Sequence, residues 1–323
     1  MTPLAEILRD EIHRGGPISF QRFMETALYH PEFGYYCRRR DPFGIRGDFY
    51  TAEQLQPVFG ILIADRIRNL WQRMGAPEDF TVVELGAGRG EMAEALREFR
   101  YVPVDVQAGG LPKCIRGVIF ANEFFDALPV HAAVMRGGRA REMCVGLAGD
   151  SFAWAEAGAA PEEVECYRKK YLGTLSNGQI FEVNLAALAW LDRIRAALEA
   201  GYVFSIDYGY TVAELPRFPL GTLMGYRRHQ ATDDVLKNPG EQDITAHVCF
   251  TALDEHGTSI GLERETLEPL SRTLISAGTA DQFARALAAD TPREQMRRRL
   301  QLKQLLADMG ETFRTLIQRA AER

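Results

Sequence analysis

The stretch VVELGAGRGEM, residues 82–92, limits what this chain can fold into more than any other. A β-branched run leads into three glycines, Gly86, Gly88 and Gly90, and an alanine-rich helical pattern follows. Glycines at a strand-to-helix turn let a ligand come close to bare backbone. The pattern predicts a ligand-binding loop with a strand at 81–85 before it and a helix at about 90–99 after it.

Strand and helix patterns alternate through the middle of the chain. Short apolar runs bounded by turn residues predict strands at 101–106 (YVPVDV), 117–121 (GVIFA) and 202–210 (YVFSIDYGY). The segment NLAALAWLDRIRAALEAG predicts a helix closed by Gly201. This alternation predicts an α/β fold, in which helices cover both faces of a mostly parallel sheet.

Three consecutive regions are expected around this core. They are a helical region at 1–75, an α/β core at 76–215 with a hairpin insertion near 131–160, and a C-terminal region at 216–323 that completes the sheet. The hairpin is expected to turn at Gly137–Gly138. In the last region a helix near 244–256, the strand GLERETLE and a charged helical tail are predicted.

The composition excludes several classes of protein. The chain has 323 residues and a net charge of −6, which argues against nucleic acid or an anionic membrane as a partner. Its five cysteines are scattered, so reduced thiols are expected, with no disulfide framework or zinc site. No signal peptide and no apolar run of about 20 residues is present, so a cytoplasmic protein is expected. A homodimer is left open.

The spacing of the glycines discriminates between ligands. A dinucleotide fingerprint would need a third glycine at position 91, where Glu91 stands. Glu84 adds another anion beside the loop, and the Gly-Lys-Ser/Thr of a nucleoside triphosphate loop is absent. A nicotinamide oxidoreductase is therefore a distant alternative.

The order E-x-G-x-G-x-G resembles motif I of the class I S-adenosylmethionine (SAM) methyltransferases. SAM carries an ammonium and a sulfonium, which a carboxylate such as Glu84 would attract. The resemblance implies a second acid at the end of the next strand, binding the ribose hydroxyls. Asp105 lies 21 residues after Glu84, about the interval seen in dinucleotide folds. The alternative is a tight turn that binds nothing.

A longer resemblance covers residues from about 15 to 318. The blocks PISFQRFMETALYHPEFGYY, GDFYTA, FGILIADRI, ANEFFDALPVH, IDYGY, GTLMGYRRHQ and NPGEQDITAHVCFTAL occur in that order. Together they resemble the MidA-like family, whose mitochondrial members serve complex I assembly as protein arginine methyltransferases. The chain departs from the family after the glycine loop, where only about 30 residues precede NEFFDALP. A helix of the family is expected to be lost there, and one strand could be lost with it.

Methylation of arginine requires carboxylates, because the guanidinium has a pKa above about 12 and must be oriented and deprotonated. Asn122 and Glu123 follow the strand IFA at the edge where open α/β sheets bind ligands. Glu123 and Asp126 are predicted as catalytic groups and Asn122 as a cofactor contact. An ordinary helix cap or loop acid is the alternative for Asp126.

Other candidates come from neighbouring motifs. Asp207 is predicted as catalytic and Tyr208 as a substrate contact, although an Asp before a Gly is also common in turns. The resemblance implies that Arg227, His229 and Asp243 frame a substrate channel, whereas Asp243 could equally cap a helix. It also implies a lid in the N-terminal region, whose candidates are Asp48 toward the substrate and Tyr50 and Thr51 toward the cofactor. A surface connector is the alternative, and no metal site is expected.

The sequence thus predicts a SAM-dependent methyltransferase that N-methylates an arginine of a protein partner. A small-molecule acceptor is one alternative, favoured by the shortened segment after the glycine loop. The other is a degenerate methyltransferase fold that acts as an assembly or binding module.

Overall fold

The computed structural model of the chain describes residues 2–37, 55–105, 110–228 and 230–321. The chain forms two compact units, each assembled from three segments. Unit 1 comprises residues 1–50, 125–189 and 210–253, and unit 2 comprises residues 51–124, 190–209 and 254–323. The units do not follow the three consecutive regions predicted from the sequence, and the roles assigned to those regions stay predictions.

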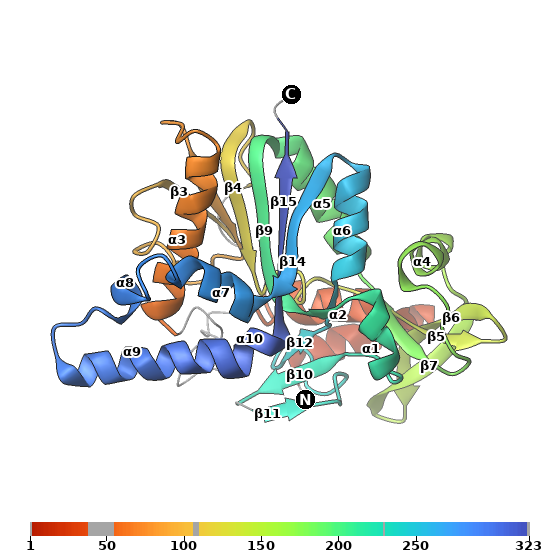
Figure 1. Ribbon diagram of the computed structural model, residues 1–323. Helices are drawn as coiled ribbons and strands as arrows, with labels where there is room; N and C mark the ends of the chain where they lie inside the picture. Colours follow the sequence, from red (N-terminus) through yellow and green to blue (C-terminus); the bar gives the residue numbers. More distant parts are fainter. Residues whose placement is uncertain (1, 38–54, 106–109, 229, 322–323) are drawn as a thin grey trace. The chain divides into compact units, whose positions relative to one another are not determined.

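Unit 2 is built on a sheet whose strands run in the order β3-β2-β4-β9-β15-β14 (Figure 1). Strand β2 pairs in parallel with β3 and β4, and β4 pairs in parallel with β9. Strand β15 is antiparallel to both β9 and β14. The predicted mostly parallel central sheet is confirmed. The bounds are β2 Thr81–Leu85, β3 Arg100–Val104, β4 Ile115–Asn122, β9 Leu198–Tyr210, β14 Leu262–Pro269 and β15 Phe313–Ala320.

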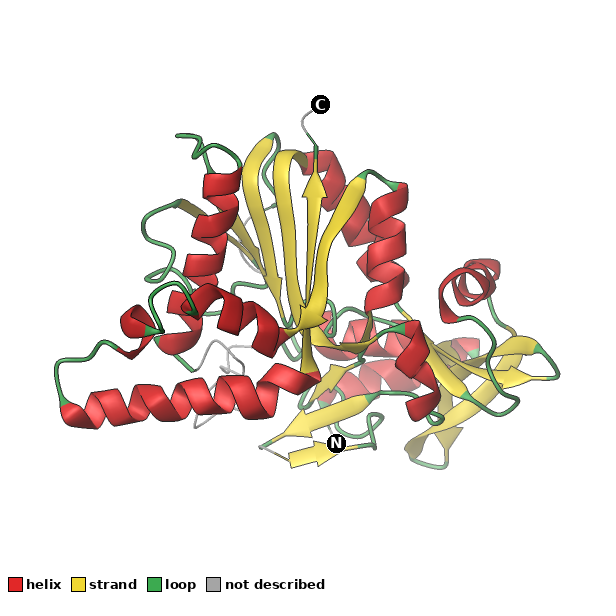
Figure 2. Cartoon of the chain, viewed as in Figure 1, coloured by secondary structure: helices red, strands yellow, loops and turns green. Residues whose placement is uncertain are grey.

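Helices lie on both faces of this sheet (Figure 2). The helices α3 and α7 share one core with the strand residues Val82, Phe120 and Phe204. Alternate strand residues such as Val83 and Ile119 point to the opposite face and are also fully buried. Figure 1 shows α5 and α6 on that side. The bounds are α3 Val58–Arg73, α5 Leu185–Ala197, α6 Phe250–Ser259, α7 Leu270–Gly278, α8 Ala284–Leu287, α9 Pro292–Gln304 and α10 Gly310–Thr312.

The predicted helix at 90–99 is wrong. The segment forms a series of turns, in which the N–H groups of Gly90, Ala93 and Phe99 donate to carbonyls three residues earlier. Met92 and Leu96 are nevertheless fully buried in the core that contains α3. The apolar spacing therefore predicted the buried side chains. The backbone mixes bonds that span three residues with one that spans four, from the Leu96 N–H to the Met92 carbonyl, and so forms turns instead of a continuous helix.

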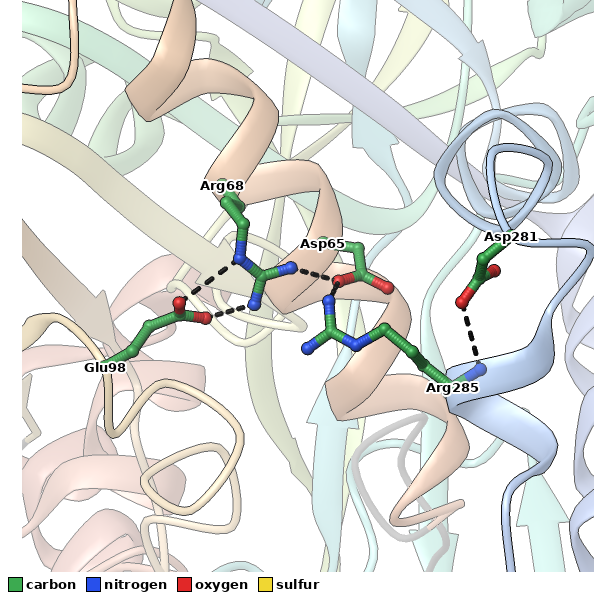
Figure 3. Close-up of polar contacts among 5 residues, drawn as sticks. All are labelled: Asp65, Arg68, Glu98, Asp281 and Arg285. Atoms are coloured by element: carbon green, nitrogen blue, oxygen red, sulfur yellow. Dashed lines mark hydrogen bonds and ion pairs between the residues drawn. The ribbon is translucent and has the colours of Figure 1, made fainter.

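An ionic network attaches this segment to α3 (Figure 3). Arg68 of α3 binds both oxygens of the Glu98 carboxylate, with an Nε–Oε2 distance of 3.2 Å, and also contacts Asp65. Asp65 also contacts the guanidinium of Arg285, and the backbone N–H of Arg285 donates to the Asp281 carboxylate at 3.0 Å. The network holds two irregular segments of unit 2 against one long helix.

Unit 1 contains a five-stranded sheet and a three-stranded sheet. In the larger sheet, β6 lies between β7 on one side and β5 and β1 on the other, and β8 pairs with β5. Gly137 and Gly138, at φ +55° and +79°, form the turn of the predicted hairpin between β5 and β6. Helices α1 and α2 share a core with the sheet through Leu8, Phe23 and Val145.

The strands of the smaller sheet run in the order β11-β10-β12. The bounds in unit 1 are α1 Pro3–Gly15, β1 Ile18–Ser19, α2 Phe20–Tyr29, β5 His131–Arg136, β6 Arg139–Ala148, β7 Ser151–Ala159, α4 Glu162–Tyr167, β8 Ile180–Val183, β10 Met224–Arg227, β11 Gln230–Thr232, β12 Asp243–Thr245 and β13 Val248–Cys249.

Two further sequence predictions need correction. The helix α5 ends at Ala197, and Gly201 lies inside β9 at φ +130°. A Cβ at Gly201 would come within 1.9 Å of the Gly117 carbonyl oxygen, so the glycine serves a close approach of two strands. The helix predicted at 244–256 starts only at Phe250, because Asp243–Thr245 forms a strand paired with β10.

The shortening after the glycine loop is visible between β3 and β4. The described residues of that connection, Asp105 and 110–114, form neither a regular helix nor a strand other than an isolated bridge at Asp105.

Candidate functional site

The glycine loop follows β2 and is built on left-handed backbone. Gly86, Gly88 and Gly90 have φ values of +70°, +51° and +72°, a region that L-residues with a Cβ avoid. A Cβ at Gly86 would also lie 3.1 Å from the Phe124 ring. The loop therefore requires glycine for its conformation, which explains the spacing that the sequence shows.

Asp105 follows β3 directly and fixes this loop. Its carboxylate accepts the N–H of Gly88 at 2.8 Å, and the carbonyl of Val104 accepts the N–H of Gly86 at 2.8 Å. The sequence predicted an acid at this strand end, but as a ribose ligand. The hydrogen bond to the loop was not predicted, because it depends on how the two strand ends meet.

Glu84 is buried in β2, with 1% of its surface exposed, and the Tyr101 hydroxyl donates to its carboxylate. Tyr101 was not predicted as a site residue. Its contact follows from the parallel register, in which Tyr101 lies opposite Val82 and Pro103 opposite Glu84. An apolar pattern places a strand but does not give its register, so the sequence carried no usable signal for this pair.

Asn122 ends β4 and is 4% exposed. Its Nδ2 donates to Glu123 Oε1 at 3.4 Å, whereas its Oδ1 is buried and has no hydrogen-bond partner in the part of the chain that the structure describes. Glu123 has φ +49°, and its N–H donates to the Ile206 carbonyl at 2.9 Å. Strained backbone of this kind is concentrated at functional sites.

Asp207 and Tyr208 lie inside β9, which continues to Tyr210, and so they do not end the strand as predicted. Asp207 is fully buried, and its carboxylate accepts the N–H of Tyr208 at 2.9 Å. The Tyr208 ring lies 4.0 Å from the Phe313 ring of the neighbouring strand. Because β4 pairs with β9 only as far as Ile206, both residues lie at the carboxyl end of β4.

A pair of aromatic side chains, Phe124 and Trp190, lies beside the glycine loop and was not predicted from the sequence. Phe124, which packs near Gly86, meets Trp190 of α5 edge to face at 5.1 Å. The Arg193 guanidinium lies 3.8 Å from the centre of the Trp190 ring. Phe124 belongs to the NEFFDALP block, but only the fold reveals its position next to Gly86.

Unit 1 holds the other predicted acids. Asp126 and Asp243 are buried, at 4% and 2% exposure. Asp126 lies in a turn with no helix after it, so it does not cap a helix, and its carbonyl accepts the Ala246 N–H at 3.0 Å. The Tyr36 hydroxyl donates to Asp243 at 2.8 Å. Burial, and then the negative charge of Asp243, raise the pKa of Tyr36 well above its ordinary value, so Tyr36 remains a donor.

The remaining candidates are less informative. Arg227 of β10 forms an ion pair with Glu241 at 2.6 Å, and both side chains are partly exposed. Asp48, Tyr50, Thr51 and His229 lie outside the described residues. Within the described ranges, no group of three or more His, Cys, Asp or Glu side chains could hold a metal ion. Across those same ranges, no helix is long and apolar enough to cross a membrane.

The residues at the carboxyl edge of the unit 2 sheet fit SAM. Three left-handed glycines leave much of the loop backbone bare, and three polar groups surround it: the buried Glu84 of β2, the buried Asn122 of β4 and the partly exposed Asp105 after β3. The buried Asn122 Oδ1 is an acceptor in need of a donor.

Comparisons with known proteins agree with this geometry. The family model described as "Putative S-adenosyl-L-methionine-dependent methyltransferase" matches residues 62–108 and 99–267. A crystal structure of a Burkholderia thailandensis protein bound to S-adenosyl-homocysteine (SAH) superimposes with a TM-score of 0.87 at 29% identity, over 98% of this chain and 91% of that one. A native crystal structure from the same organism gives a TM-score of 0.84. The fold is therefore that of the class I methyltransferases.

Curated relatives carry a more specific name. The mitochondrial protein arginine methyltransferase NDUFAF7 homolog of Drosophila melanogaster is 27% identical, over 76% of this chain and 68% of that protein. Human NDUFAF7, also named as mitochondrial, is 26% identical over 78% and 68%. These names give no support to the cytoplasmic location expected from the sequence. The match to the family model and to the SAH-bound structure shows that the chain is a member of the MidA-like family of SAM-dependent methyltransferases.

Proposed function

We propose that this enzyme transfers the methyl group of SAM to an arginine side chain of a protein partner. The names of the curated relatives support this acceptor. The observation that carries the proposal is the pair of carboxylates at the sheet edge of unit 2, namely Glu123 in strained backbone and the buried Asp207.

The cofactor is assigned to unit 2. The glycine loop gives close backbone approach, and Asp105 is proposed for the ribose hydroxyls while it holds Gly88. Glu84 supplies negative charge next to the loop for the ammonium group, and Asn122 offers a buried amide. Tyr50 and Thr51 remain cofactor candidates from the sequence. When bound, SAM supplies an electrophilic methyl group on a sulfonium.

The protein's own residues then have to prepare the acceptor. A guanidinium stays protonated at neutral pH, because its pKa is about 12 or more. Its attack on the methyl carbon therefore requires oriented carboxylates and a proton acceptor. Glu123 is proposed for this role, because the hydrogen bond from its N–H to Ile206 holds it in an unusual conformation at the sheet edge. The C–S bond breaks as the N–C bond forms, and the released proton goes to a carboxylate.

Asp126 and Asp243, both buried in unit 1, stay candidates from the sequence, Asp126 as a catalytic group and Asp243 as a substrate contact. The Tyr36 hydroxyl orients Asp243, and the Asp126 main chain is tied to the segment after β12. Arg227, His229 and Asp48 stay substrate candidates. The proposal includes neither nucleic acid nor a membrane as a partner.

The first test separates donor binding from acceptor choice. Calorimetry with SAM and SAH should show binding to the wild type and none to Gly86→Val. Transfer of a radiolabelled methyl group is then measured in lysate with the wild type and with Glu123→Gln. Labelled protein bands whose acid hydrolysate contains methylarginine, and which Glu123→Gln loses while still binding SAM, support the proposal.

The alternatives predict other results. A label that appears only in small molecules would show that the acceptor is a small molecule, the alternative favoured by the short segment after the glycine loop. SAM binding without any transfer would favour an assembly module, and no binding at all would remove the donor assignment.

A further inference from the structure

The strand β7 is an open edge of the larger sheet in unit 1. It has nine residues, Ser151–Ala159, and among the described residues it pairs only with β6. Figure 1 shows β6 and β7 as a hairpin. An edge of this length presents a row of backbone groups that another strand can bind. Proteins usually protect such edges with lysine, proline or a covering segment.

The composition of β7 lacks that protection. Its sequence SFAWAEAGA contains no lysine and no proline, and Glu156 is its one charged residue. Glu156 is already paired with Arg136 of β5 at 3.1 Å. An approaching strand would therefore meet an edge with almost no net charge.

The turn fixes which backbone groups face outward. Gly149 and Asp150 form a two-residue turn between the paired residues Ala148 and Ser151. A two-residue hairpin closes on a hydrogen-bonded pair, and such pairs alternate along the ladder. Ala155 therefore bonds toward β6, whereas the N–H and C=O groups of Trp154 and Glu156 point away from it.

A cavity of about 220 Å³ opens on one face of the sheet next to this edge. It is lined by Val134, Met143 and Ile180, with Arg136, Trp154 and Glu156 at the side toward β7. Trp154 is 40% exposed, although its ring also packs against Phe20 at 5.0 Å. An exposed Trp beside an apolar cavity is typical of interfaces rather than of free surface.

We propose that β7 pairs antiparallel with β7 of a second copy of this chain, in a register centred on Ala155. This register is symmetric about a twofold axis, as homodimer interfaces usually are. It is regular around Trp154, Ala155 and Glu156, because the irregularity in the pairing of β7 with β6 lies farther along, between Glu156 and Ala159. Trp154 of one copy then lies opposite Glu156 of the other copy. It is beside the cavity of that other copy, within reach of the Arg136 that pairs with this Glu156, for a cation–π contact. Because each Glu156 has its own Arg136, the two copies meet without strong like-charge repulsion. The interface is independent of methyl transfer.

Sedimentation velocity on the full chain tests the interface by a change of charge. In the proposed register Ala153 lies opposite Ala157 of the other copy. Ala153→Lys/Ala157→Lys places like charges opposite each other and should raise the dimer dissociation constant by at least about tenfold. Ala153→Lys/Ala157→Asp is the matched control, since it places opposite charges there, and it should remain dimeric. SAM binding and thermal unfolding verify that both variants fold.

A second variant tests the register. Ala155→Cys would face itself across a non-hydrogen-bonded pair, with Cα atoms about 4.5 Å apart, which suits a disulfide. Mild oxidation should give a covalent dimer with Ala155→Cys but not with Ala159→Cys or with the wild type, which controls for Cys114 and Cys166. A monomeric wild type at its highest soluble concentration would overturn the proposal. So would a Lys/Lys variant that dimerises as tightly as the wild type.

Discussion

The Asp105 carboxylate and the Gly88 N–H are joined by a 2.8 Å hydrogen bond, which ties the end of β3 to the middle of the glycine loop. One acid thus supports the loop that is proposed to bind the donor and is itself proposed to contact the donor. Any change at Asp105 should therefore alter the affinity for SAM through both routes.

Asp105→Ala is expected to weaken SAM binding at least about tenfold, because hydrogen bonds to charged groups contribute about 1.5 to 3 kcal/mol. Asp105→Asn keeps an acceptor for Gly88 but loses the charge. Its dissociation constant for SAM should therefore lie between those of the wild type and Asp105→Ala. Calorimetry measures both. An unchanged affinity in Asp105→Ala would show that neither role matters.

Gly86→Ala should lower both stability and SAM affinity. The residue would keep a left-handed backbone, which costs an L-residue roughly 1–2 kcal/mol, and its Cβ would lie 3.1 Å from Phe124. Gly15→Ala is the control, because Gly15 lies in the helix α1 and no atom lies within 4 Å of a Cβ built there. Thermal unfolding and SAM titration should leave the control unchanged; equal losses in both variants would contradict the strain argument.

Arg68→Met should destabilise unit 2 by about 1 to 2 kcal/mol, since Glu98 loses its contact with Arg68 and Asp65 keeps only the more exposed Arg285. Arg97→Met is the comparison. It removes a guanidinium from the segment 90–99, where Arg97 pairs with Glu94 and the two side chains are 75% and 81% exposed. That change should stay within about 0.5 kcal/mol. Urea unfolding measures both, and similar losses would mean that the network of Figure 3 has no special contribution.

The hydrogen bond from Arg168 lowers the pKa of Glu165 from 4.5 to about 2. A carboxylate with a lowered folded pKa stabilises the folded state above its unfolded pKa, and this contribution disappears as the pH falls from about 4.5 toward 2. Glu165→Gln should therefore flatten the pH dependence of unfolding in that range and leave it unchanged between pH 6 and 8. Unfolding curves across the two ranges check the sign.

Tyr36→Phe should lower kcat/KM for the acceptor by about tenfold or more, because Asp243 loses a buried donor. The affinity for SAM should not change, since the glycine loop and its supports belong to unit 2. Asp243→Asn is the companion variant. It keeps an acceptor for Tyr36 but removes the charge needed to bind a guanidinium, so it should also lose activity. If Tyr36→Phe lost activity and Asp243→Asn did not, the Tyr36 hydroxyl would matter by itself and not through Asp243.

The sequence predicted those parts of the site that depend on local conformation. Gly86, Gly88 and Gly90 were recognisable because left-handed backbone demands glycine, and Asp105 and Asn122 because polar residues follow apolar strands. Tyr101 and Tyr36 were missed because their hydroxyls meet Glu84 and Asp243 through strand register and long-range packing.

The two wrong helix predictions have related causes. Residues 90–99 have high helix propensity, yet the segment forms turns, in which Met92 and Leu96 are buried and Glu98 contacts Arg68. Asp243–Thr245 was assigned to a helix, but pairing with β10 makes it a strand. In both places tertiary contacts override local propensity.

The interleaved segments of the two units have a consequence for biosynthesis. The chain passes from one unit to the other after residues 50, 124, 189, 209 and 253, so no continuous stretch contains either unit complete. Strand β15 joins β9 to β14 in unit 2, although more than a hundred residues separate it from β9 in the sequence. During synthesis β9 therefore stays without its partner β15 until residues 313–320 emerge, and we expect slow folding that exposes an unpaired strand to chaperones.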